Sequence, residues 1–152
     1  MRIAMLLPLL LAGCSEPLQE SSAAPATTMP SIIGLYERAG VPDRPSRICI
    51  AGQAEDRRFG LNSSYEGPQS CTAKGSVRQT GAALTLVIDG DPACRLSAVA
   101  TATGLTLNAP EGDECGYYCG AHTDLDAGKF GKVGETEADA RKAVDIVGES
   151  LC

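Results

Sequence analysis

The sequence is poor in aromatic residues and has only one histidine. Among its 152 residues there is no tryptophan, and there are two phenylalanines, four tyrosines and the single His122. Because large rings bury the most apolar area per residue, a core built mainly from Ala, Val, Leu and Ile gains less from burial. We therefore expect a small domain that depends on covalent cross-links for part of its stability.

Motifs of the common enzyme classes are also missing. The chain has no G-x-S-x-G nucleophile motif, phosphate-binding loop or dinucleotide-binding fingerprint. His122, followed by Thr123 and Asp124, could act as a general base oriented by a carboxylate. An exposed loop histidine without a catalytic role is the preferred interpretation. We expect a protein that is not an enzyme and that uses no cofactor or metal.

Basic residues are in the minority, with 13 Lys and Arg against 19 Asp and Glu. This balance argues against nucleic acid as a partner and against electrostatic attraction to anionic headgroups. The acidic excess is concentrated near the C-terminus, since residues 111–152 carry ten acidic and four basic side chains. An acidic surface of this kind would suit a basic protein, through electrostatic steering.

The longest uncharged apolar run is short and lies at the N-terminus. Arg2 precedes the apolar residues 3–11, and the small residues Ala12 and Gly13 lead into Cys14. The run is too short to span a bilayer and is typical of a secretory signal. The stretch resembles the lipobox of bacterial lipoproteins, which implies cleavage before Cys14 and its acylation, with chains such as palmitate. The alternative is an ordinary secretory signal with an accidental cysteine.

This resemblance divides the chain into three parts. Residues 1–13 are the expected lipoprotein signal peptide, residues 14–30 the lipidated Cys14 with a flexible Ser/Ala/Thr/Pro-rich tether, and residues 31–152 a single domain. The tether has a mean reach of roughly 20–24 Å. Two or three acyl chains suffice for stable membrane attachment. Ser15 after the cysteine resembles the outer-membrane sorting choice, so we expect an outer-membrane anchor with the domain facing the periplasm.

Six cysteines remain besides Cys14, and an even number in an exported chain is typical of a disulfide framework. Cys115-x-x-x-Cys119 could be half of a zinc site, but the oxidising compartment and the lone histidine favour disulfides. The sequence leaves fifteen pairings open. The six residues are Cys49, Cys71, Cys94, Cys115, Cys119 and Cys152.

Alternating apolar residues predict about seven short strands between residues 31 and 110. Leu84, Leu86 and Ile88 give the clearest alternation, and the turn at residues 89–92 follows them. The spacing favours a mainly β domain, as a small antiparallel barrel or sandwich. The other strands are expected around residues 33–35, 48–50, 59–61, 71–77, 94–100 and 105–107.

A helical turn is expected at residues 113–119. It would place Cys115 and Cys119 on one face, so each should bond to a cysteine elsewhere in the chain. Between them lie Tyr117 and Tyr118, and a tyrosine pair on a disulfide-fixed turn makes a good contact surface. The alternative is that one ring packs into the core and the other covers it. With the nearby Asp124 and Asp126, the two tyrosines form our candidate interaction surface.

The last forty residues are expected to contain a loop and a helix. The glycines at 128, 131 and 134 predict an irregular loop. Residues 137–147 give the clearest helix signal of the chain, with Thr136 and Asp139 close to a capping box and Gly148 as its end. Cys152 should tie this acidic tail into the fold.

Part of this region also resembles a calcium-binding loop. Asp124, Asp126 and Glu135 occupy the first, third and twelfth positions, but Lys129 stands where the sharp turn requires glycine. A lysine among divalent-cation ligands is unfavourable, so a solvated acidic loop is the preferred interpretation.

Two functions are compatible with these features. The first is a lipid-anchored binding module that recognises a basic envelope protein. In size, anchor and β architecture it is similar to the small periplasmic inhibitors of lysozymes and proteases, but no inhibitory motif can be carried over. The alternative is a structural or scaffolding outer-membrane lipoprotein without a soluble ligand. An exposed apolar patch would favour the scaffold, and a projecting loop the inhibitor.

Overall fold

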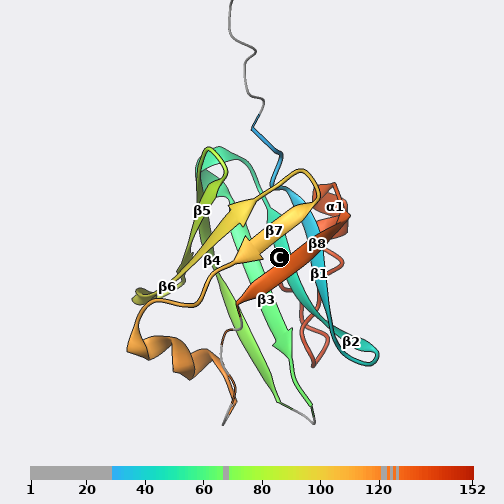
Figure 1. The fold of residues 1–152 in the computed structure, drawn as a ribbon, viewed down its shortest axis with the longest axis vertical. Coiled ribbons are helices and arrows are strands. Elements are labelled where there is room, and N and C mark those ends of the chain that lie inside the picture. The colour runs from blue at the N-terminus through green and yellow to red at the C-terminus, as the bar shows by residue number, and fades with distance from the viewer. Residues whose placement is uncertain (1–28, 67–68, 121–122, 124, 126) are drawn as a thin grey trace, which may run out of the picture.

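The computed structural model describes residues 29–66, 69–120, 123, 125 and 127–152. Within these residues it contains eight strands, each antiparallel to the next, and β8 pairs with β1, so the sheet closes into a barrel (Figure 1). The expected mainly β antiparallel fold is confirmed, with one strand more than expected. The strands are β1 (Gly34–Val41), β2 (Arg44–Ala51), β3 (Arg58–Ser64), β4 (Ser70–Thr80), β5 (Ala83–Ile88), β6 (Asp91–Ala100), β7 (Gly104–Leu107) and β8 (Gly128–Gly134); the helical elements are the 3₁₀ helices η1 (Ala54–Asp56) and η2 (Asp113–Tyr118) and the helix α1 (Glu137–Ala140).

The barrel interior is filled by alternate residues of the strands. Three rings lie in it, each at most 2% exposed, namely Tyr36, Phe59 and Phe130. Aliphatic side chains supply most of the rest, together with the buried Cys71, Cys94 and Cys115. The alternation in β5 is the one expected, since Leu84, Leu86 and Ile88 are buried.

The glycine-rich segment at 128–134 is a strand, so the expectation of an irregular loop is wrong. A Cβ atom at Gly128 or Gly134 would overlap the side chain of Arg38 or Asp139, and glycines of the neighbouring strands lie close to the backbone of β8. A Cβ atom at Gly34 of β1 would overlap the carbonyl oxygen of Gly134, and one at Gly104 of β7 would overlap that of Phe130. Residues without a side chain are therefore needed along the two seams where β8 closes the barrel.

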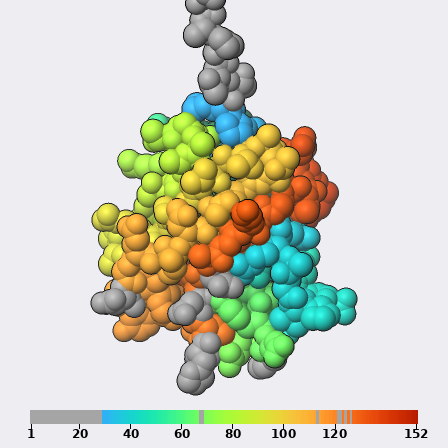
Figure 2. Space-filling model, in the orientation of Figure 1, coloured from blue at the N-terminus to red at the C-terminus, as the bar shows by residue number. Residues whose placement is uncertain are grey.

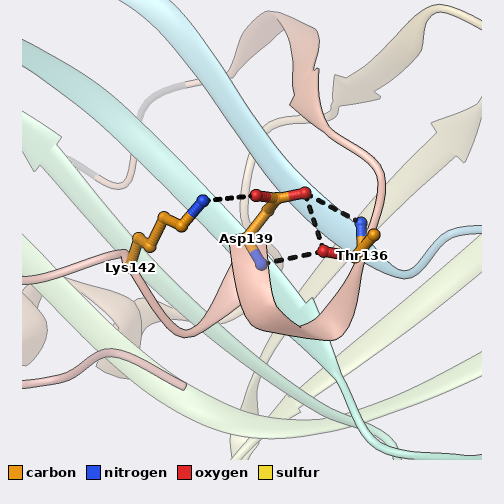
Figure 3. A network of polar contacts seen from close by, with 3 residues as sticks. All are labelled: Thr136, Asp139 and Lys142. Atoms are coloured by element: carbon orange, nitrogen blue, oxygen red, sulfur yellow. Dashed lines mark hydrogen bonds and ion pairs between the residues drawn. The ribbon is translucent and has the colours of Figure 1, made fainter.

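The helix expected over residues 137–147 ends at Ala140, so that expectation is wrong for all but the first turn. Its capping box is present: Asp139 N donates to Thr136 Oγ1 at 3.1 Å, and Thr136 N donates to Asp139 Oδ2 at 3.2 Å (Figure 3). Lys142 adds an ion pair to Asp139 at 2.6 Å. Beyond it the chain folds back, and Leu151 N donates to Ala143 O at 2.9 Å.

The early end of α1 has a packing cause. Cys49 and Ala51 on the outer face of β2 need a cover, and Ala140, Ala143 and Leu151 bury themselves against them as a second small core. A straight helix would carry residue 151 away from this face. The expected apolar helix face is not formed, because residues 144–147 lie in the turn and Val147 is 75% exposed.

Three disulfides join the six cysteines other than Cys14, as expected. The pairs are Cys49–Cys152, Cys71–Cys119 and Cys94–Cys115. The first ties the last residue to β2, as the position of Cys152 indicated. The other two tie η2 to β4 and β6, so Cys115 and Cys119 each bond elsewhere, which confirms the prediction for this turn.

The two ends of the barrel differ. Pro30 enters at the end formed by the β4–β5 turn, where its carbonyl accepts a hydrogen bond from Gln79 Nε2 at 3.2 Å. The η2 segment lies at the opposite end, and the space-filling view shows it far from the first described residues (Figures 1 and 2). In the described part of the chain, no helix is long and apolar enough to cross a membrane.

Candidate functional site

The η2 segment is held at both of its ends by covalent bonds. Cys115 is bonded to Cys94 of β6, and Cys119, directly after η2, is bonded to Cys71 of β4. Cys71 and Cys94 are fully buried in the barrel. A 3₁₀ segment of six residues is weakly stable by itself. The two disulfides therefore supply the rigidity that its local hydrogen bonds lack.

Tyr117 projects from this segment into solvent. Its side chain is 83% exposed, the largest value for any large hydrophobic residue in the described ranges. The preceding Gly116 is equally open, because a Cβ atom there would meet no atom within 4 Å. Glu114 and Glu111 are exposed on the same short stretch. The site thus presents one aromatic ring among carboxylates on a cross-linked turn.

Tyr118 has a different role from its neighbour. Its ring packs against the barrel core, and its hydroxyl donates to Asp91 Oδ2 at 3.0 Å. Asp91 Oδ1 in turn accepts from the backbone N–H groups of Ala93 and Cys94, at 3.0 and 3.3 Å. Burial and then the hydrogen bond to Asp91 raise the pKa of Tyr118. Of the two expected tyrosines, one anchors the turn and one is free for contact.

The remaining residues of the candidate surface are only partly accounted for. Asp124 and Asp126 lie outside the described residues, as do His122 and Cys14. Between the two aspartates, Leu125 is buried in the barrel core at 1% exposure. Thr123 Oγ1 donates to Gly120 O at 2.7 Å.

Lys129 and Glu135 of the possible calcium loop do not share a compact turn. Lys129 lies in β8, which is extended from Gly128 to Gly134, and Glu135 follows at its far end. At a rise of about 3.3 Å per residue, a strand of this length separates its ends by roughly 20 Å. In the described part of the chain, no three His, Cys, Asp or Glu residues come together in a way that could hold a metal.

A second exposed feature was not expected from the sequence. Because α1 ends early, Val144, Ile146 and Val147 are left 36%, 49% and 75% exposed. We call these three residues the C-terminal apolar patch. Val144 and Val147 lie at helical spacing, so the sequence pattern alone assigns these two to a buried helix face, and the end of α1 at Ala140 leaves them exposed instead.

The fold and the site define a small disulfide-bonded β-barrel that carries a cross-linked surface turn. No family model, curated protein or solved structure matches the chain.

Proposed function

We propose that this protein is a lipid-anchored binding module of the bacterial envelope that recognises a basic protein through the η2 turn. The observation that carries the proposal is the exposure of Tyr117 on a segment fixed by two disulfides. A solvated aromatic ring gains nothing for the fold, and tyrosine is among the residues that dominate binding energy at protein interfaces.

Rigidity makes this ring a favourable contact. Binding costs free energy when loops and side chains become ordered, at about 0.5–1.5 kcal/mol for each immobilised flexible side chain. Tyrosine has only two side-chain torsions. The turn beneath it is already ordered by its disulfides and by the Tyr118–Asp91 hydrogen bond. Little of the contact energy is therefore lost on ordering.

The charge around Tyr117 selects the partner class. Glu111 and Glu114 precede Tyr117 on the same exposed stretch, and the C-terminal region carries most of the acidic excess. Carboxylates at the rim of an interface act mainly by steering a basic partner and raising its association rate. Lysozymes and secreted proteases with basic surfaces are the candidates that fit, in line with the architectural likeness to their inhibitors.

The position of the turn fits an anchored protein. The chain enters the barrel beside Gln79, at the end opposite η2 (Figure 1). If Cys14 is acylated, the tether leads from the membrane to that entry end, and η2 faces away from the lipid. A partner in the periplasm then has access to Tyr117.

The kinetics of binding to basic hydrolases test the proposal. The full chain in its Cys14→Ser form is measured against a panel of basic lysozymes and secreted proteases, with Tyr117→Ala and Glu114→Gln. Tyr117→Ala should raise the dissociation rate at least about thirtyfold, as expected for loss of about 2 kcal/mol from an anchoring residue. Glu114→Gln should lower the association rate, and the loss should shrink in high salt.

Matched controls separate the site from general effects. Val99→Ala removes an exposed side chain on the outer face of β6, and Glu149→Gln removes the same charge on the C-terminal segment. Both should leave the rates unchanged. Absence of binding to every basic hydrolase at low and physiological salt would refute the inhibitor-like role.

One observation, the C-terminal apolar patch, favours the alternative function as a scaffold. An exposed cluster of this kind marks a contact surface when it is rimmed by polar residues. The double substitution Ile146→Asp and Val147→Asp should release the protein from a large envelope assembly, whereas Tyr117→Ala should not. If both variants remain in the assembly, neither surface holds the protein there.

A further inference from the structure

A second polar site lies at the entry end of the barrel, where η1 leads from β2 into β3. A cavity of about 190 Å³ opens there, and Arg57 and Arg78 face it together with Ser76, Gln79 and Glu55. Val77 N donates to Arg57 O at 2.9 Å, which holds the start of β3 against the end of β4. Pockets for drug-sized ligands occupy roughly 300–1,000 Å³. This cavity therefore suits a small group, or one end of a larger molecule.

The two arginines have hydrogen-bonding capacity that the described residues do not use. Arg57 Nη1 donates to Gln79 Oε1 at 3.2 Å, but Arg57 Nε is buried and has no partner among the described residues. The Arg78 side chain makes no hydrogen bond or ion pair within the part of the chain that the structure describes. Buried donors without an acceptor are rare and unfavourable, above all on charged groups.

The surroundings of the cavity are ordered before any ligand arrives. Gln79 Nε2 donates to the carbonyls of Pro30 and Gly81, at 3.2 and 3.0 Å, which turns Gln79 Oε1 toward Arg57. Ala54 has φ of 41°, in the left-handed region that side chains other than glycine seldom adopt. Backbone strain of this kind gathers at ligand-binding positions.

We propose that this cavity binds an oxyanion, the phosphate group of a phosphodiester. Guanidinium groups offer paired N–H donors that match phosphate oxygens, and Ser76 adds a hydroxyl. Glu55 offsets one of the two positive charges, so the lining has a formal charge of one positive unit. That balance favours the monoanionic diester over a phosphate dianion.

A phosphodiester ligand has room to extend beyond the cavity. Ser76 and Arg78 also border a shallow depression on the outer face of β4, β5 and β6, whose other residues include Thr85, Val87 and Arg95. Strand pairing sets Arg78 beside Thr85 and Ser76 beside Val87. The hydroxyl groups there can accept and donate hydrogen bonds to a polar substituent next to the phosphate.

The phosphodiester can come from a soluble molecule or from a phospholipid headgroup. The cavity borders Gln79, which contacts Pro30, so it lies at the end where the tether enters. The lipid source rests on the proposed membrane anchor, whereas the oxyanion site itself does not. Headgroup binding would hold this end against the bilayer and direct η2 outward.

Titration of the full chain in its Cys14→Ser form tests the site. The probes are glycerophosphoethanolamine, inorganic phosphate and vesicles of phosphatidylethanolamine, each at matched sodium chloride. NMR of the arginine Nε–H groups follows the soluble probes, and sedimentation follows the vesicles. Glycerophosphoethanolamine should shift the Arg57 Nε–H signal in a saturable way and bind more tightly than inorganic phosphate.

Three variants assign the response to the cavity. Arg78→Ala, which breaks no side-chain hydrogen bond or ion pair within the described residues, should weaken binding roughly ten- to hundredfold, the loss expected for a charge-assisted hydrogen bond. Arg57→Lys keeps the charge but removes the paired donors, and should weaken binding as well. Arg58→Ala is the control, because Arg58 forms its ion pair with Asp89 and does not line the cavity.

The outcomes separate the sources. If the soluble diester binds saturably and Arg78→Ala weakens this binding, the site is supported. If only vesicles bind and Arg78→Ala weakens that binding as well, the site is supported with a lipid as its ligand. No saturable response to any probe, or a response that neither Arg78→Ala nor Arg57→Lys reduces, would overturn the proposal. Arg78→Ala should leave the rates at the η2 turn unchanged, so the two proposals fail independently.

Discussion

Removal of the Cys49–Cys152 disulfide should destabilise the protein more than removal of either of the others. A disulfide acts largely by restricting the unfolded chain, and its effect grows with the length of chain that it closes. The three bridges span sequence separations of 103, 48 and 21 residues. The loop-entropy relation then gives about 4.7, 4.1 and 3.3 kcal/mol at 25 °C.

The Cys49–Cys152 pair also makes the cleanest test. Cys152 is only half-buried, and both residues belong to the small outer core, so their loss opens no cavity in the barrel. Urea unfolding of Cys49→Ala/Cys152→Ala should show a loss of about 4–5 kcal/mol. The double variant Cys94→Ala/Cys115→Ala also opens buried space, so part of its loss in the free energy of unfolding comes from the cavity. Unfolding of the reduced wild type, which keeps the cysteine side chains, corrects for this part.

Hydrogen exchange distinguishes global from local effects in the first of these variants. Loss of the bridge should free the segment after Ala140, and the Leu151 N–H that bonds to Ala143 O should lose its protection first. Amides of β4 and β5 should remain protected relative to it. A free-energy loss below about 1 kcal/mol, or unchanged protection of Leu151, would refute the view that this bridge holds the C-terminal segment in place.

Two further predictions concern ionisable groups. Burial raises the pKa of Tyr36 to about 12, above the value near 10 of an unfolded tyrosine. The contribution of Tyr36 to stability is therefore complete below pH 10 and is lost as the pH rises toward 12. In this range the free energy of unfolding should fall more steeply with pH for the wild type than for Tyr36→Phe. At pH 7 the Tyr36→Phe substitution should cost about 1 kcal/mol, because the hydrogen bond to Ile32 O is lost. Hydrogen bonds from Lys142 and Thr136 hold the pKa of Asp139 well below its usual range, so its contribution is present above about pH 4 and is lost as the pH falls below that value. Asp139→Asn should lower Tm more at pH 7 than at pH 2, with Glu149→Gln as the control, and an equal change in Tm at both pH values would contradict this reasoning.

Most of the barrel could be predicted from the sequence because its strands carry a full apolar alternation. Leu84, Leu86 and Ile88 identify β5 without any knowledge of its neighbours. The eighth strand escapes this reasoning, since it carries one large apolar residue on its inner face, Phe130, among three glycines. Gly128 and Gly134 leave room for the side chains of Arg38 and Asp139, which belong to other elements, so in the sequence alone the glycines of this segment indicate a loop.

The prediction of a long C-terminal helix fails for a related reason. Thr136 and Asp139 specify its start, and both are local to it. Its end is set by the packing of the C-terminal segment over Cys49 and by the disulfide between Cys152 and Cys49, which are 103 residues apart. Sequence patterns describe what a segment prefers by itself, and here a distant packing requirement outweighs that preference.

The two candidate sites differ in the same way. The η2 turn could be predicted from the sequence because Cys115, Tyr117 and Cys119 are close together in the chain. The oxyanion cavity was not, since Arg57 and Arg78 are brought together only by the pairing of β3 with β4. A site that depends on strand register leaves no motif in the sequence.

Site-specific photo-crosslinking in living cells tests the central proposal most directly. A photoreactive phenylalanine derivative is placed at Tyr117 and, as the control, at Val99 on the outer face of β6. The account predicts that position 117 forms a crosslink to a basic envelope or secreted protein, that Glu114→Gln reduces its yield, and that position 99 forms none. Equal crosslinking from both positions, or none from position 117, would contradict it.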